Sequence, residues 1–129
     1  MHINKVKKFY KKAERNSIDA KSPMEVVKAM VTELHRSMKT VAGTTQNNEK
    51  RLVRSKHFSR SLVLIYTLQT SLDFEHGGNL ATQLFQLYEY CRQQLIKGFK
   101  NQLIDGIQKA INALDEIFFI EKKEESINV

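Results

Sequence analysis

Tryptophan is absent from the 129-residue chain, and cysteine, proline and glycine are scarce, at one, one and five residues. The single cysteine, Cys91, cannot form an internal disulfide, so a disulfide-stapled domain is excluded. No apolar run approaches the roughly 20 residues that span a bilayer. No apolar core of about 7–15 residues follows the basic N-terminus, as it would in a signal peptide. These absences predict a cytosolic protein without a membrane span.

Positive charge is unevenly distributed along the chain. Residues 1–60 carry 15 Lys and Arg against 5 Asp and Glu, whereas residues 61–129 carry 6 against 9. Such an asymmetry is typical of a nucleic-acid or membrane footprint, or of a basic surface that steers an acidic protein partner. A solvated helical face that only keeps the protein soluble has the same composition. The sequence leaves these interpretations open, with a protein partner favoured over nucleic acid.

Apolar residues recur every three or four positions through almost the whole chain, which predicts helices rather than strands. Residues 3–15 are basic with sparse apolar positions, so they predict a short helix that holds only when docked. Ser22, Pro23 and Glu25 have the spacing of an N-cap, a first helical residue and a capping-box partner. This spacing predicts that a second helix begins directly after Ser22.

The remaining boundaries are predicted from glycines and polar runs. Gly43 and the polar residues after it are expected to end the second helix. Further helices are predicted over residues 49–73, from Asn79 onward, and over residues 100–123. The charged tail, 121–129, is expected to fray.

Four amphipathic helices of similar length joined by short connections are typical of an antiparallel bundle. The wide apolar stripes indicate that each helix meets two neighbours. We therefore predict an all-α fold, an antiparallel four-helix bundle with a short additional N-terminal helix. It forms one domain over residues 1–129, in which residues 1–20 are expected to be a mobile N-terminal arm.

No pattern of residues predicts catalysis, a metal site or a cofactor. Cys91 lies on an apolar helix face, where a free cysteine usually acts as a small hydrophobe. Gly77 and Gly78 lack the lysine and hydroxyl that follow the glycines of a phosphate loop, so a tight turn with positive φ is favoured. The scattered histidines do not predict a bundle metal site, which combines i, i+3 or i, i+4 pairs of carboxylate and histidine from facing helices: His2, His35, His57 and His76.

Basic residues interleaved with aromatic ones crowd the N-terminal segment. Such a pattern can bind nucleic acid through phosphate contacts and stacking, although no known reader motif accompanies it. The favoured alternative is an amphipathic arm that packs its apolar side chains onto the bundle. The residues concerned are Lys5, Lys7, Lys8, Phe9, Tyr10, Lys11, Lys12 and Arg15.

Residues 71–78 read S-L-D-F-E-H-G-G, followed by Leu80-Ala81, Leu84 and L-Y-E-Y at 87–90. Their order and spacing resemble the central signature of the FliS family of flagellar export chaperones. That family typically reads S-L-D-[MF]-E-x-G-G, then L-A, then L-Y-D-Y-M. The resemblance covers residues 10–99.

Two other segments bear on this resemblance. The start of the second helix, at Ser22, is similar to the T-P-E-E-L-L start of the family, and Tyr10 occupies the place of the tyrosine in its mobile N-terminal segment. The chain departs from the family at residues 30–34, where L-Y-D-G-A is common, and in lacking a C-terminal tryptophan. Phe118 and Phe119 are candidates for that role.

The resemblance implies a cytoplasmic chaperone without catalytic activity or cofactor. It would bind the disordered C-terminal segment of flagellin, prevent premature polymerisation and aid type III secretion. Other flagellar export or regulatory proteins are further candidate partners. The alternative from a different class is a basic helical nucleic-acid-binding protein, which would bind duplex with steep salt dependence. A bundle enzyme is a third interpretation, which the apolar core positions disfavour.

A flagellin-binding groove needs apolar residues beyond those that one bundle core consumes. Leu64, Phe85, Ile96 and Phe99 lie beside the main apolar stripes and are candidates for it. In this interpretation the N-terminal arm covers part of the groove until the client displaces it. Helical phase and the family resemblance together give the expected groove residues: Tyr10, Leu64, Ile65, Leu68, Leu72, Leu80, Leu84, Phe85, Leu87, Tyr88 and Cys91.

Overall fold

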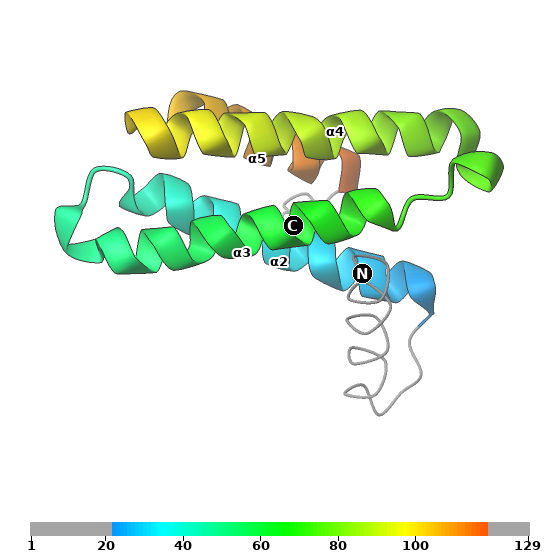
Figure 1. Ribbon diagram of the computed structural model, residues 1–129, viewed down its shortest axis with the longest axis horizontal. Coiled ribbons are helices and arrows are strands. Elements are labelled where there is room, and N and C mark those ends of the chain that lie inside the picture. The colour runs from blue at the N-terminus through cyan, green and yellow to red at the C-terminus, as the bar shows by residue number, and fades with distance from the viewer. Residues whose placement is uncertain (1–21, 119–129) are drawn as a thin grey trace, which may run out of the picture.

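The computed structural model describes residues 22–118, which form four helices packed as an antiparallel bundle (Figure 1). Each helix packs against its neighbours along the chain, and the first also packs against the last. The predicted all-α four-helix fold is confirmed, whereas the predicted N-terminal helix, the arm over 1–20 and the tail over 121–129 lie outside the described residues. The elements are α2 (Pro23–Thr44), the 3-10 helix η1 (Asn48–Lys50), α3 (Arg51–Thr70), α4 (Phe74–Asn101) and α5 (Asp105–Phe118).

Helix α2 begins where the sequence predicts. The Ser22 hydroxyl oxygen accepts a hydrogen bond from the Glu25 backbone N–H at 3.2 Å, and Pro23 lies in the first turn. An N-cap of this kind stabilises a helix by about 1 kcal/mol. The helix continues through Gly43 to Thr44, since an exposed glycine costs a helix only about 1 kcal/mol and does not end it.

Helix α4 begins earlier than predicted. The Asp73 carboxylate accepts hydrogen bonds from two backbone N–H groups of the first turn, at 3.1 and 3.2 Å. Asp73 is therefore the N-cap, and the helix starts at Phe74 rather than near Asn79. The predicted positive φ is confirmed at Gly78, whose φ of 51° and ψ of −127° interrupt the helix without ending it.

The turn between α4 and α5 was predicted wrongly, because a helix was expected from residue 100. Instead α4 runs to Asn101, and Gln102 adopts a left-handed conformation with φ 55°. The N–H groups of Gln102 and Leu103 both donate to the Gly98 carbonyl, which closes the end of α4. Glycine is the usual residue at such a position, so the sequence carries no signal for the turn.

One hydrophobic core runs along the axis of the bundle, and its fully buried members come from all four helices. Several apolar residues near the ends of helices are exposed, among them Met24, Val53, Leu80 and Ile117. Each lies in the first or last turn of a helix, or in the first turn beyond the Gly78 break, where neighbouring helices no longer cover it. The largest core side chains are Leu34, Met38, Ile65, Leu68, Tyr88, Leu95, Ile107 and Leu114.

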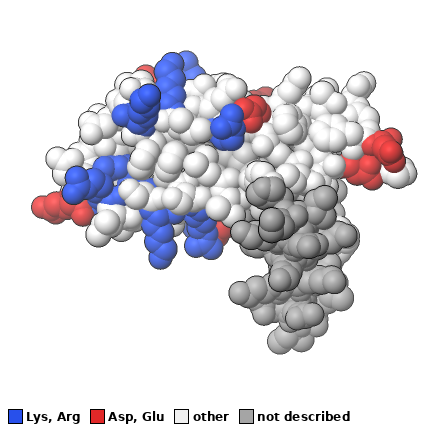
Figure 2. Space-filling model, viewed as in Figure 1, with Lys and Arg blue, Asp and Glu red and all other residues white. Residues whose placement is uncertain are grey.

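The charge asymmetry persists in the folded part of the chain. Residues 22–72, which form α2 and α3, carry 8 Lys and Arg against 3 Asp and Glu, whereas residues 73–118 carry 4 against 6. Most Lys and Arg side chains visible in Figure 2 lie towards the end of the bundle that holds the α2–α3 and α4–α5 connections. None of the helices in residues 22–118 is long and apolar enough to cross a membrane.

Candidate partner-binding surface

The predicted groove residues fall into three groups. Those in the core have at most 8% of their surface exposed, so they hold the helices together and offer nothing to a partner in this conformation. Leu72 and Leu84 are half-buried and pack against the core, while Leu80 and Phe85 are exposed. Tyr10 lies outside the described residues. The core group comprises Leu64, Ile65, Leu68, Leu87, Tyr88 and Cys91.

The two exposed residues, Leu80 and Phe85, lie on different sides of α4. Five positions of an α-helix turn about 140° around its axis. Phe85 lies on the α3 side, because its backbone carbonyl accepts a hydrogen bond from Gln69 of α3. Leu80 shares a helical phase with Cys91, whose thiol contacts the Ala110 carbonyl of α5. The structure therefore does not bring the predicted groove residues together on one surface.

An exposed apolar surface does exist along the boundary of α3 and α4, and we call it the α3–α4 surface: Tyr66, Phe74, Phe85 and Ile96. The rings of Phe74 and Phe85 lie 6.1 Å apart in a tilted arrangement. Ile96 shares the helical phase of Phe85, and Tyr66 lies one turn before Gln69, which contacts Phe85. Sequence periodicity identified Phe85 and Ile96 but not Phe74, which was assigned to the turn.

Near the C-terminal end of α4, a stacked pair of aromatic rings joins α3 and α4. The centroids of Phe58 and Phe99 lie 3.9 Å apart and their planes differ by 8°. Both side chains are half-buried. Phe99, which was expected to supply the groove, therefore contributes first to the contact between the helices.

A polar cluster also joins the two helices, and we call it the Glu89 cluster: Gln69, Glu89, Arg92 and Gln93. Arg92 donates to both carboxylate oxygens of Glu89, at 2.9 and 2.6 Å. Gln69 of α3 donates to the same carboxylate at 3.2 Å. These bonds, those from Arg92 above all, lower the pKa of Glu89 to about 2. Each partner in the cluster is already hydrogen-bonded.

The residues considered for chemistry in the sequence have structural partners. Burial raises the pKa of the Cys91 thiol to about 12, so the reactive thiolate is scarcely populated at neutral pH. His57 contacts the Ser37 hydroxyl at 3.3 Å, and His76 contacts the Asp73 carboxylate at 2.7 Å. Across residues 22–118, no three His, Cys, Asp or Glu side chains are placed to hold a metal ion.

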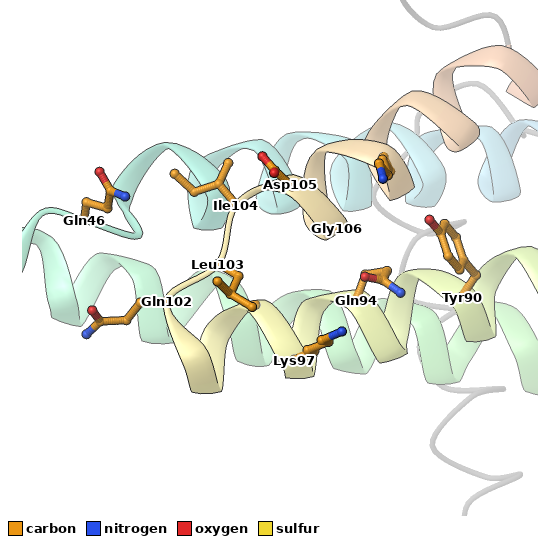
Figure 3. A pocket seen from close by; sticks show the side chains of 11 residues that line it. Gln46, Tyr90, Gln94, Lys97, Gln102, Leu103, Ile104, Asp105 and Gly106 are labelled. Carbon is orange, nitrogen blue, oxygen red and sulfur yellow. The ribbon is translucent and has the colours of Figure 1, made fainter.

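A cavity of about 530 Å³, which sequence reasoning missed, opens between the last turns of α4 and the start of α5 (Figure 3). It is lined mainly by polar side chains of α4, α5 and the turn between them, and Gln46 of the α2–α3 connection lies at one end (Figure 3). The only sequence signal for it is a pair of glycines, Gly98 and Gly106, one in each of the two helices. These glycines mark close backbone approach rather than a ligand.

Comparison with protein families gives one match. The family model described as Flagellar protein FliS matches residues 6–118, which is most of the chain and includes all of the described residues, 22–118. This is a family of non-enzymatic chaperones. Comparisons with curated proteins and with solved structures find no match.

Proposed function

Because the chain belongs to the FliS family of flagellar proteins, which act as export chaperones, we propose that it binds the disordered C-terminal segment of flagellin in the cytoplasm. That segment is needed for filament assembly, so a chaperone that covers it prevents polymerisation before export. The bound flagellin is then delivered to the type III secretion apparatus. Other flagellar export or regulatory proteins are secondary candidate partners.

The observation that carries this proposal is the exposed α3–α4 surface. A self-contained bundle needs apolar residues only on the inner faces of its helices. Helix α3 buries Ile65 and Leu68 in the core, yet it exposes Val63 and Tyr66 on its outer side. A disordered client that folds into a helix on binding needs such an apolar strip to offset its loss of conformational entropy.

The path of the client follows from the distribution of exposed residues. Phe85 and Ile96 face the α3 side of α4, whereas Leu80 faces the α5 side. A client that contacts both must wrap around α4 rather than lie in one groove. Within this proposal, the buried members of the predicted set, such as Leu64 and Tyr88, support the surface from beneath.

Calorimetric titration of the full chain with a peptide of the flagellin C-terminal segment tests the proposal. Phe85→Ala should weaken binding roughly 30-fold, or about 2 kcal/mol, as expected for a central aromatic contact. Ile96→Ala should weaken it about fivefold. Ile117→Ala is the matched control, because Ile117 has a similar exposure, 49% against 37% for Ile96, but lies on α5 outside this surface. Equal losses for the two isoleucine variants, or no binding by the unmodified chain, would refute the proposal.

The basic end of the bundle is the feature that favours the alternative of nucleic-acid binding. Several of the arginines there are already engaged by other groups of the protein, which counts against this alternative. Arg60 pairs with Glu33 at 2.9 Å and Arg36 pairs with the same carboxylate at 3.2 Å. Arg54 is buried and donates to backbone carbonyls. Fewer cations are thus available than the sequence indicates. Duplex binding that falls by orders of magnitude as salt rises from 50 to about 200 mM would favour this alternative.

A further inference from the structure

The cavity between α4 and α5 owes its shape to two glycines. A Cβ on Gly98 would lie 2.5 Å from both the Leu103 carbonyl oxygen and the Ile107 side chain, so the helices touch there. A Cβ on Gly106 would lie 2.1 Å from the Gln94 side-chain oxygen. The helices separate on the outer side of this contact and leave a volume of about 530 Å³. Small-molecule sites typically have volumes of about 300–1,000 Å³.

Several polar side chains around this cavity bond to no other group of the described residues, in contrast to the Glu89 cluster. Within residues 22–118, no hydrogen bond or ion pair engages the side chains of Gln94, Gln102, Lys97 or Lys109, although all four line the cavity. The side chains of the Glu89 cluster, by comparison, are bonded to one another. Polar groups gathered around a cavity without mutual bonds are available to a ligand.

The charge around the cavity favours an anion. Lys97 of α4 and Lys109 of α5 place one ammonium group on each wall, against the single carboxylate of Asp105. The carboxamides can donate further hydrogen bonds to an oxyanion. The first turn of α5, which includes Gly106, adds backbone N–H groups that have no acceptor within the helix.

We propose that this cavity binds an oxyanion, either a polycarboxylate or a phosphate group, held between Lys97 and Lys109. Its volume exceeds that of a single phosphate, so a tricarboxylate or two neighbouring acidic side chains of a peptide would also fit. The site lies on the α5 side of α4, away from the α3–α4 surface. It is therefore independent of the proposed contact with flagellin.

Nuclear magnetic resonance titration of the ¹⁵N-labelled full chain tests this proposal with three probes: inorganic phosphate, citrate and acetylated tetraglutamate. Saturable shifts of the Gly106 amide and the Gln94 and Gln102 side-chain amides are expected, with dissociation constants of about 1 mM or tighter. Tighter binding of phosphate or citrate would identify a free anion, and tighter binding of the peptide would identify an acidic segment of a protein. Absence of saturable shifts with all three probes would overturn the proposal.

Matched variants distinguish specific binding in the cavity from general attraction of anions to a positively charged surface. Lys97→Ala and Lys109→Ala should each weaken binding about fivefold. Lys100→Ala removes the same charge from the same helix as Lys97→Ala, but Lys100 does not line the cavity, so binding should not change. Gly106→Ala should displace Gln94 into the cavity and abolish the shifts, while thermal unfolding reports that the fold persists. Equal weakening by Lys97→Ala and Lys100→Ala would overturn the proposal.

Discussion

The α2–α3 and α4–α5 connections lie at the same end of the bundle, yet opposite devices hold them (Figure 1). At the first, the buried guanidinium of Arg54 donates to the backbone carbonyls of Thr44 and, at 3.1 Å, Asn47. At the second, Gly98 lets α5 and its preceding turn approach the backbone of α4. The α2–α3 connection depends on a long charged side chain, whereas the α4–α5 connection depends on a glycine, which has no side chain.

This difference determines how each connection can fail. The carbonyls of Thr44 and Asn47 each accept a hydrogen bond from a backbone N–H of the connection. Arg54 adds a second donor to both and brings a positive charge to the end of α2. The α4–α5 turn needs space at Gly98. The Leu103 N–H donates to the Gly98 carbonyl, which brings the backbone of the turn so close to Gly98 that a side chain there would collide with it. Removing atoms should therefore break the first connection, and adding atoms should break the second.

Adding one methyl group to the second connection should have the largest effect. In Gly98→Ala the new Cβ would lie 2.5 Å from the backbone oxygen of Leu103, which cannot move without opening the turn. We expect a loss of about 3 kcal/mol in the free energy of unfolding, measured by urea denaturation.

Gly43→Ala is the control for this substitution, because nothing lies within 4 Å of the added Cβ on this exposed helical glycine. It should stabilise the protein by about 0.5–1 kcal/mol through helix propensity alone. If Gly98→Ala were also stabilising, close packing would not hold the turn.

Removing the donor from the first connection should have the next largest effect. Arg54→Met keeps most of the side-chain length but removes the charged donor that the Thr44 and Asn47 carbonyls share, so each carbonyl keeps only its backbone hydrogen bond. The expected loss is about 2 kcal/mol in the free energy of unfolding. Lys56→Met, an exposed change in the same helix, should stay within about 0.5 kcal/mol of the unmodified chain. Equal unfolding midpoints for the two variants would contradict this account.

These two connections also show how far the sequence determines the fold. The start of α2 was predictable because Ser22 and Pro23 act locally, through one hydroxyl and one fixed φ. The conformation of Gln102 was not, because this residue type rarely adopts positive φ and tertiary contacts at Gly98 impose the turn. Capping residues encode local boundaries, whereas packing decides those without a cap.

The candidate surface was harder to predict for a related reason. Helical phase gives the direction of a side chain but not which neighbour lies there. Leu64 was expected beside the core stripe and is buried, since α2 and α3 pack closely along that side. Tyr66, two residues later, is exposed. The cavity was beyond sequence reasoning because α4, α5 and the α2–α3 connection all contribute to it.

The Glu89 cluster at the boundary of α3 and α4 is a third contact between helices, held by hydrogen bonds between side chains. Its loss should have the smallest effect on stability. In the folded protein the pKa of Glu89 is about 2, below the ordinary value of 4.5. The Glu89 carboxylate therefore stabilises the fold fully above about pH 4.5. This stabilisation is lost as the pH falls from 4.5 towards 2. We expect about 1 kcal/mol, because the side chain of Arg92 is 43% exposed and solvent screens the pair.

Urea denaturation between pH 5 and about pH 2.5 measures this contribution. Glu89→Gln should flatten the loss of stability over that range, since the amide does not titrate. Glu116→Gln removes an exposed carboxylate of α5 and should leave the pH dependence nearly unchanged. If both variants kept the slope of the unmodified chain, the bonds from Gln69 and Arg92 would add nothing to the stability of the α3–α4 boundary. The Phe58–Phe99 stack and the core would then hold that boundary alone, as close packing holds the α4–α5 turn.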